Sequence, residues 1–162
     1  MRTPSPASRP AHARARWSGV LLALALVSVW PVATRAEALA HPERHYAVET
    51  TGTSTRVKAG EAGTFVLRVQ AHGDAYISPR TPLSLVLGGE GVTFEQSRLG
   101  LADVSAGGPV EGSDSVTPRF DVPFRVSGQG PARIEAKLTF FLCTPSSCTR
   151  QVRDISVPIR AD

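Results

Sequence analysis

Apolar and polar residues alternate with a period of two along most of the chain after residue 45, and no segment there shows a helical stripe. This alternation predicts β-strands with one face on a core. Residues 132–143 are the longest such segment. One expected face carries Ile134, Ala136, Leu138, Phe140 and Leu142, and the other carries Arg133, Glu135, Lys137, Thr139, Phe141 and Cys143.

Further strands are predicted from shorter patterns. Residues 65–71 and 119–126 alternate clearly, and Pro123 indicates an edge or a bulge in the second. Residues 83–87 are nearly all apolar and are expected to be buried on both faces. The remaining strands are expected at residues 46–50, 53–58, 92–95 and 149–159. About eight strands separated by Gly- and Pro-rich turns are typical of an all-β, immunoglobulin-like β-sandwich.

Residues 100–117 are a long segment with no apolar pattern. Loops of this length in a small domain are often functional or mobile. The segment is equally well explained as a tolerated insertion at the surface.

The first 40 residues follow a different pattern. Arg2, Arg9, Arg14 and Arg16 precede the apolar residues 17–30, and small residues follow at the alternate positions 34, 36, 38 and 40. This order predicts a signal peptide, residues 1–40, that is cleaved between residues 36 and 40. An uncleaved anchor is the alternative, although the apolar run is somewhat short for a membrane span. No cysteine lies near the junction, which excludes a lipoprotein.

The formal charge of +4 belongs to this leader rather than to the predicted domain, residues 41–162. Five of the 18 Lys and Arg residues and one of the 14 acidic residues lie in the first 40 residues, which leaves 13 of each. A neutral domain lacks the clustered basic residues that phosphate binding needs, so we expect no nucleic-acid partner. We expect a periplasmic or secreted protein with no stable membrane insertion after cleavage.

The two cysteines carry the candidate chemistry. Cys143 and Cys148 are separated by Thr-Pro-Ser-Ser, which predicts a tight turn between two strands. Facing each other across such a hairpin, they can form a disulfide without backbone movement. Closing a loop of about six residues stabilises the fold by only about 2 kcal/mol, so the bond is a weak staple. Its place at a loop tip suits a reducible bond.

Two interpretations of this pair remain open. Exported domains often carry one inert disulfide, and spacing alone cannot separate that case from a redox pair. Phe141 is predicted on the same face as Cys143, where it shields the cysteine, forms a docking patch or lies under a second sheet.

Several short motifs occur in an order that resembles a known family. They are DAYISP at residues 74–79, PLSL at 82–85, FDVPF at 120–124 and the long strand that leads into Cys143-x4-Cys148. Together they resemble the periplasmic N-terminal domain of the thiol:disulfide interchange protein DsbD, over most of residues 46–162.

This resemblance implies an immunoglobulin-like domain that receives electrons through Cys143 and Cys148 and passes them to exported thioredoxin-like proteins. Tyr76 would match an aromatic residue that packs near the pair. Residues 100–117 would match a cap over the cysteines, with Asp103 as a carboxylate that handles protons. The chain departs from the family in having no aromatic residue in this loop. The family's membrane conduit is missing, so a separate membrane electron donor is expected.

The sequence leaves open whether the chain is an enzyme. If the pair exchanges disulfides, the chain is a protein-disulfide reductase component that needs no cofactor. No metal is expected, because His41, His45 and His72 lack the spacing of a ligand set. The competing hypothesis is a non-catalytic binding or adaptor domain with a structural hairpin disulfide.

Overall fold

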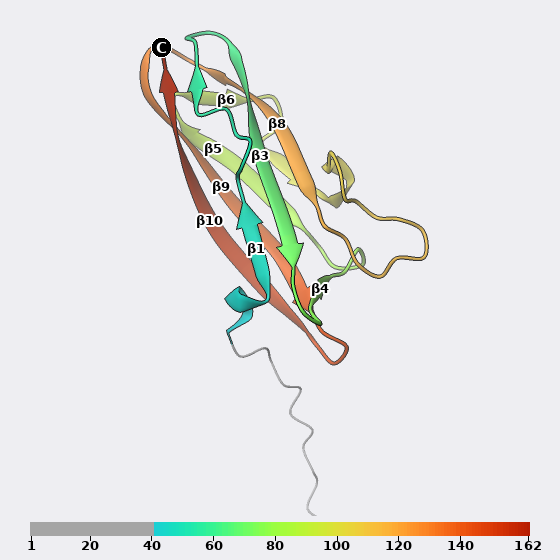
Figure 1. Ribbon diagram of the computed structural model, residues 1–162. Helices are drawn as coiled ribbons and strands as arrows, with labels where there is room; N and C mark the ends of the chain where they lie inside the picture. The colour runs from blue at the N-terminus through green and yellow to red at the C-terminus, as the bar shows by residue number, and fades with distance from the viewer. Residues whose placement is uncertain (1–40) are drawn as a thin grey trace, which may run out of the picture. The chain divides into compact units, whose positions relative to one another are not determined.

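The computed structural model describes residues 41–162, which form two β-sheets (Figure 1). The predicted signal peptide lies outside these residues. The strands are β1 (Tyr46–Glu49), β2 (Arg56–Val57), β3 (Ala62–Ala71), β4 (Tyr76–Ile77), β5 (Ser84–Glu90), β6 (Val92–Phe94), β7 (Arg98–Gly100), β8 (Arg119–Val126), β9 (Gly130–Cys143) and β10 (Cys148–Ala161). Two short 3₁₀ turns, η1 (Pro42–Arg44) and η2 (Leu101–Asp103), complete the regular structure of this part of the chain.

The two sheets make a β-sandwich, which confirms the predicted all-β class. One sheet has the strand order β1-β3-β8-β6. The other has the order β2-β10-β9-β5-β7, and β4 pairs with the end of β9. All pairs are antiparallel except β2 with β10.

The core lies between the sheets and is built from the faces that the alternation predicts. Buried side chains of β3 and β8 pack on those of β5 and β9: Phe65, Leu67, Val69, Phe120, Val122, Phe124, Leu85, Leu87, Ile134, Leu138 and Phe140. Tyr46 of β1 crosses between the sheets, and its ring meets that of Phe140 edge to face at 5.0 Å between centroids.

The hairpin of β9 and β10 runs the length of the six-stranded sheet. Each strand has 14 residues, and they pair without a bulge from Cys143 and Cys148 to Gly130 and Ala161. The four-residue turn between the cysteines is therefore as predicted. Because an unbroken register preserves the period of two, the whole hairpin keeps one face on the core.

Three expectations need correction. The segment 83–87 is not buried on both faces, because no described part of the chain covers the outer face of β5 at Val86, which is 38% exposed. The described residues hold ten strands rather than about eight, because the short strands β4 and β7 carry no alternation. Pro123 is expected in an edge strand or a bulge, whereas β8 lies between β3 and β6. The pairing of β8 with β6 stops at Phe124, so Pro123 itself pairs with β3 alone and has no strand on its other side within the described residues.

Candidate functional site

Cys143 and Cys148 form a disulfide at the tip of the β9–β10 hairpin. Their Cα atoms are 4.0 Å apart, somewhat closer than the spacing of about 4.5 Å that is typical of directly opposed residues in a non-hydrogen-bonded antiparallel pair. The turn between them is also closed by the backbone, because Thr144 N–H donates to the Ser147 carbonyl over 2.8 Å. A backbone hydrogen bond thus closes this turn in addition to the disulfide.

The two sulfur-bearing residues differ in their exposure. Cys143 is 0% exposed, whereas Cys148 is an exposed residue. Position in the sheet explains the difference: Cys143 lies between β10 and β4, whereas no strand within residues 41–162 lies on the other side of β10 at this end. A reagent can therefore approach the disulfide from the side of Cys148.

Tyr76 lies directly beside the disulfide. It pairs with Cys143 across β4 and β9, and Cys143 pairs with Cys148 across β9 and β10. The three residues therefore lie side by side on neighbouring strands at the tip. Phe141, two residues earlier on β9, is half-buried and lies opposite Arg150 of β10. Both residues thus lie close to the cysteine pair along the sheet.

A pocket of about 580 Å³ opens next to the tip. It is lined by Tyr76, Ser78, Arg80, Asp114, Ser115 and Pro145. Pro145 belongs to the cysteine turn, and Asp114 forms an ion pair with Arg80. Neither cysteine lines this pocket, which reaches the hairpin tip only through Pro145.

The long segment 100–117 reaches this pocket with its second half. Thr117 N–H donates to the Gly107 carbonyl over 3.0 Å and closes residues 107–117 into a loop. Gly107 has φ +67°, and a Cβ there would lie 1.9 Å from the Thr117 carbonyl oxygen, so the closure requires glycine. Val116 then bridges Ile77 of β4. The hydrogen bonds of the described residues join the loop to β4 and not to the cysteines, so the cap over them stays a prediction.

Asp103 lies in η2, at the beginning of the same segment. Its carboxylate accepts a hydrogen bond from Gly100 N–H over 2.7 Å and one from the Gln96 amide over 3.2 Å. The Gly100 bond, followed by the Gln96 bond, lowers the pKa of Asp103. A carboxylate held ionised in this way is a poor proton carrier near neutral pH, so its proposed proton handling stays a prediction without support from these contacts.

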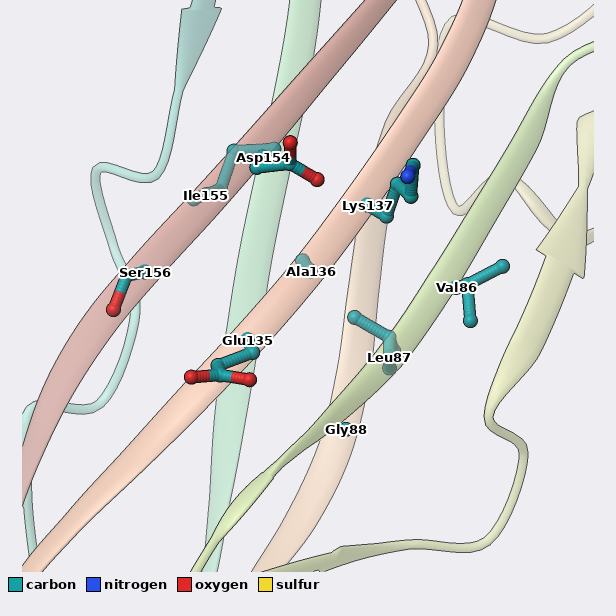
Figure 2. A pocket seen from close by; sticks show the side chains of 9 residues that line it. All are labelled: Val86, Leu87, Gly88, Glu135, Ala136, Lys137, Asp154, Ile155 and Ser156. Carbon is teal, nitrogen blue, oxygen red and sulfur yellow. The ribbon is translucent and has the colours of Figure 1, made fainter.

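A second concavity, of about 510 Å³, lies on the outer face of the six-stranded sheet (Figure 2). It is lined by Val86, Leu87, Gly88, Glu135, Ala136, Lys137, Asp154, Ile155 and Ser156. Gly88 leaves the space open because it has no side chain. Lys137 lies between Val86 and Asp154 in the register. The sequence did not predict this concavity, although the polar face of residues 133–143 indicates that one face of this strand lies at the surface.

No helix among the described residues is long and apolar enough to cross a membrane. Within residues 41–162, no group of three His, Cys, Asp or Glu side chains is placed to hold a metal ion.

Comparison with known proteins gives distant likenesses only. No protein-family model matches the chain, and no curated protein matches it. Domains 4 and 5 of the S-layer protein SbsC are similar at 13% identity and a TM-score of 0.38, over 71% of this chain and 50% of that one, so the chain spans half of that structure. A conjugative transposon lipoprotein from Bacteroides eggerthii DSM 20697 is similar at 11% identity and a TM-score of 0.38, over 72% of this chain and 98% of that one. Neither is a DsbD domain, and the resemblance to that family stays a prediction.

Proposed function

We propose that this chain is an exported β-sandwich that exchanges disulfides through Cys143 and Cys148, and that Cys148 is the sulfur attacked by a partner. The observation that carries the proposal is the unequal exposure of the two cysteines at a hairpin tip. Exchange needs an approach path for a thiolate, and the free side of β10 provides one at Cys148.

The chemistry proceeds in two steps. A partner thiolate attacks Sγ of Cys148, the bond to Cys143 breaks, and Cys143 leaves as a thiolate that takes a proton from water. A second thiol of the partner then attacks the partner's own sulfur in the mixed disulfide and releases Cys148. The partner ends as a disulfide and this chain as a dithiol, which can reduce an exported thioredoxin-like protein by the reverse sequence.

The hairpin supports this role because it does not depend on the bond. Strands of 14 residues and the Thr144 hydrogen bond hold the tip, whereas the short disulfide loop adds only about 2 kcal/mol. Reduction therefore leaves the scaffold in place for the return reaction.

The test is to trap mixed disulfides with single variants. Cys143→Ser leaves the exposed Cys148 thiol, and we expect it to attack the disulfide of an exported thioredoxin-like protein and to stay joined to it as a mixed disulfide. Cys148→Ser leaves only the buried Cys143 thiol and is expected to capture much less. The double variant is the control. The native pair is expected to have a reduction potential above about −300 mV, since structural disulfides usually lie below that value.

A binding or adaptor domain with a structural disulfide is the second candidate, and the complete burial of Cys143 favours it. A buried thiolate is a poor leaving group, because an apolar environment disfavours the charge. A potential well below −300 mV with no trapped partner would support this candidate and refute disulfide exchange.

The cellular setting is part of the same proposal. The leader at residues 1–40 supports export to the periplasm or beyond, where disulfides persist. A separate membrane protein would then supply the electrons.

A further inference from the structure

The outer edge of β10 is a long strand edge without a neighbour. β2 pairs only with Arg160 and Ala161, and no strand of the described part of the chain pairs with β10 from Cys148 to Ile159 on that side. In Figure 1, β10 borders the sheet with β9 on its other side. Unpaired N–H and C=O groups on such an edge are a template for another strand.

The direction of the backbone groups on this edge is fixed. Arg160 N–H donates to Thr55 and Asp162 N–H to Val57, both toward the edge. Because β10 has no bulge, the even-numbered residues from Cys148 to Ser156 direct their backbone groups to the same side. Their side chains project from the outer face of the sheet, beside the half-buried Thr139 and the exposed Lys137 and Glu135 of β9.

We propose that a second copy of this chain occupies this edge, with the two β10 strands antiparallel about a twofold axis at Val152. In this register Arg150 of each copy lies opposite Asp154 of the other, and the two Val152 side chains lie opposite each other. Val152 is 39% exposed, which is unusual for a large apolar residue of this protein. The two strands would join the six-stranded sheets into one continuous sheet.

Charge selects this register from its neighbours. An axis at Arg153 would place two guanidinium groups opposite each other, and an axis at Asp154 would oppose two carboxylates. An axis at Gln151 would pair Arg150 with Val152 and form no ion pair. Opposite charges across a strand pair stabilise it and like charges destabilise it, so the register at Val152 is favoured. It makes the same ion pair twice, because the interface is symmetric.

Within one copy, neither Asp154 nor Arg150 forms an ion pair among the described residues. Asp154 faces Lys137 in the register, but within residues 41–162 neither forms an ion pair within 4.0 Å. Arg150 is exposed and faces Phe141. A second copy would thus give Arg150 its carboxylate partner.

The test is the association constant of the protein as purified from the cells that express it, measured by analytical ultracentrifugation. The native protein is expected to form dimers. Arg150→Glu and Asp154→Arg should each weaken association about tenfold, because each places like charges in contact twice. The double variant Arg150→Glu plus Asp154→Arg should restore it. Arg125→Glu, an exposed reversal on β8, is the matched control and should change nothing.

Cross-linking tests the register independently of the charges. In a background of Cys143→Ser plus Cys148→Ser, Val152→Cys is expected to form a covalent dimer on oxidation, since directly paired Cα atoms lie about 5.5 Å apart. Asp154→Cys should not, because the two positions would lie about 13 Å apart.

The dimer would place Ser156 of the second copy opposite Cys148 and so cover the side of β10 from which we propose that a thiolate approaches, so exchange would require the monomer. The two proposals can be tested separately, because none of the charge variants changes a cysteine. A monomer at every concentration would overturn the dimer proposal and leave the edge to a segment of another protein. So would a dimer that ignores both charge reversals, or equal cross-linking at residues 152 and 154.

Discussion

At the scale of the residue, the number of neighbouring strands determines how far the two cysteines are buried. Cys143 is buried because it has strands on both sides, and Cys148 is exposed because it has one. The alternation of apolar residues in β3, β8 and β9 could be predicted because one face of each meets the opposite sheet. The exposure of Val86 could not, since a run of apolar residues does not show that one face of β5 lacks a covering layer.

A tight contact at Gly63 gives a prediction at this scale. A Cβ at Gly63 would lie 2.5 Å from Cζ of Phe124 and 2.9 Å from Cγ2 of Val57, both in the core. Gly63→Ala should therefore lower the free energy of unfolding by about 1–3 kcal/mol, because the core must shift to accept a methyl group.

The matched control is Gly88→Ala in β5, where nothing lies within 4 Å of the added Cβ. Urea denaturation of the two variants should show a loss for Gly63→Ala and little change or a small gain for Gly88→Ala. Equal effects would mean that the contact at Gly63 does not constrain the core.

At the scale of the element, the β9–β10 hairpin was the most predictable part and the surroundings of its tip the least. Its boundaries follow from long alternation and from a turn containing Pro145. The two-residue strand β4 places Tyr76 beside Cys143, yet two residues carry no periodicity that could predict a strand. Only the resemblance to a family anticipated an aromatic residue there.

Removing the disulfide should leave this hairpin folded. We expect Cys143→Ser plus Cys148→Ser to lower the free energy of unfolding by about 2 kcal/mol and the melting temperature by about 10 °C at most. Thermal unfolding followed by circular dichroism measures both, and the native protein under reducing conditions is the companion sample. If the double variant or the reduced native protein unfolded at room temperature, the fold would require the disulfide.

At the scale of the whole molecule, charge and export are linked. The leader carries the net positive charge, so cleavage should leave a domain with 13 basic and 13 acidic residues. Sequencing the N-terminus of the exported protein is expected to find a start between residues 37 and 41. A protein that still begins at Met1 in the membrane fraction would identify residues 17–30 as an anchor instead.

The two ends of the sandwich differ in what they carry. At one end, His72 N–H donates to the His45 carbonyl, which brings the start of β1 next to the segment that leads to Tyr76 and the disulfide. At the other end, Ala161 pairs with Gly130 and the chain finishes at Asp162 (Figure 1). A fluorescent protein or affinity tag attached after Asp162 would therefore sit far from the cysteines and leave their reactions undisturbed. A label attached at His41 would instead sit at the same end of the sandwich as the disulfide and would be expected to slow its reactions.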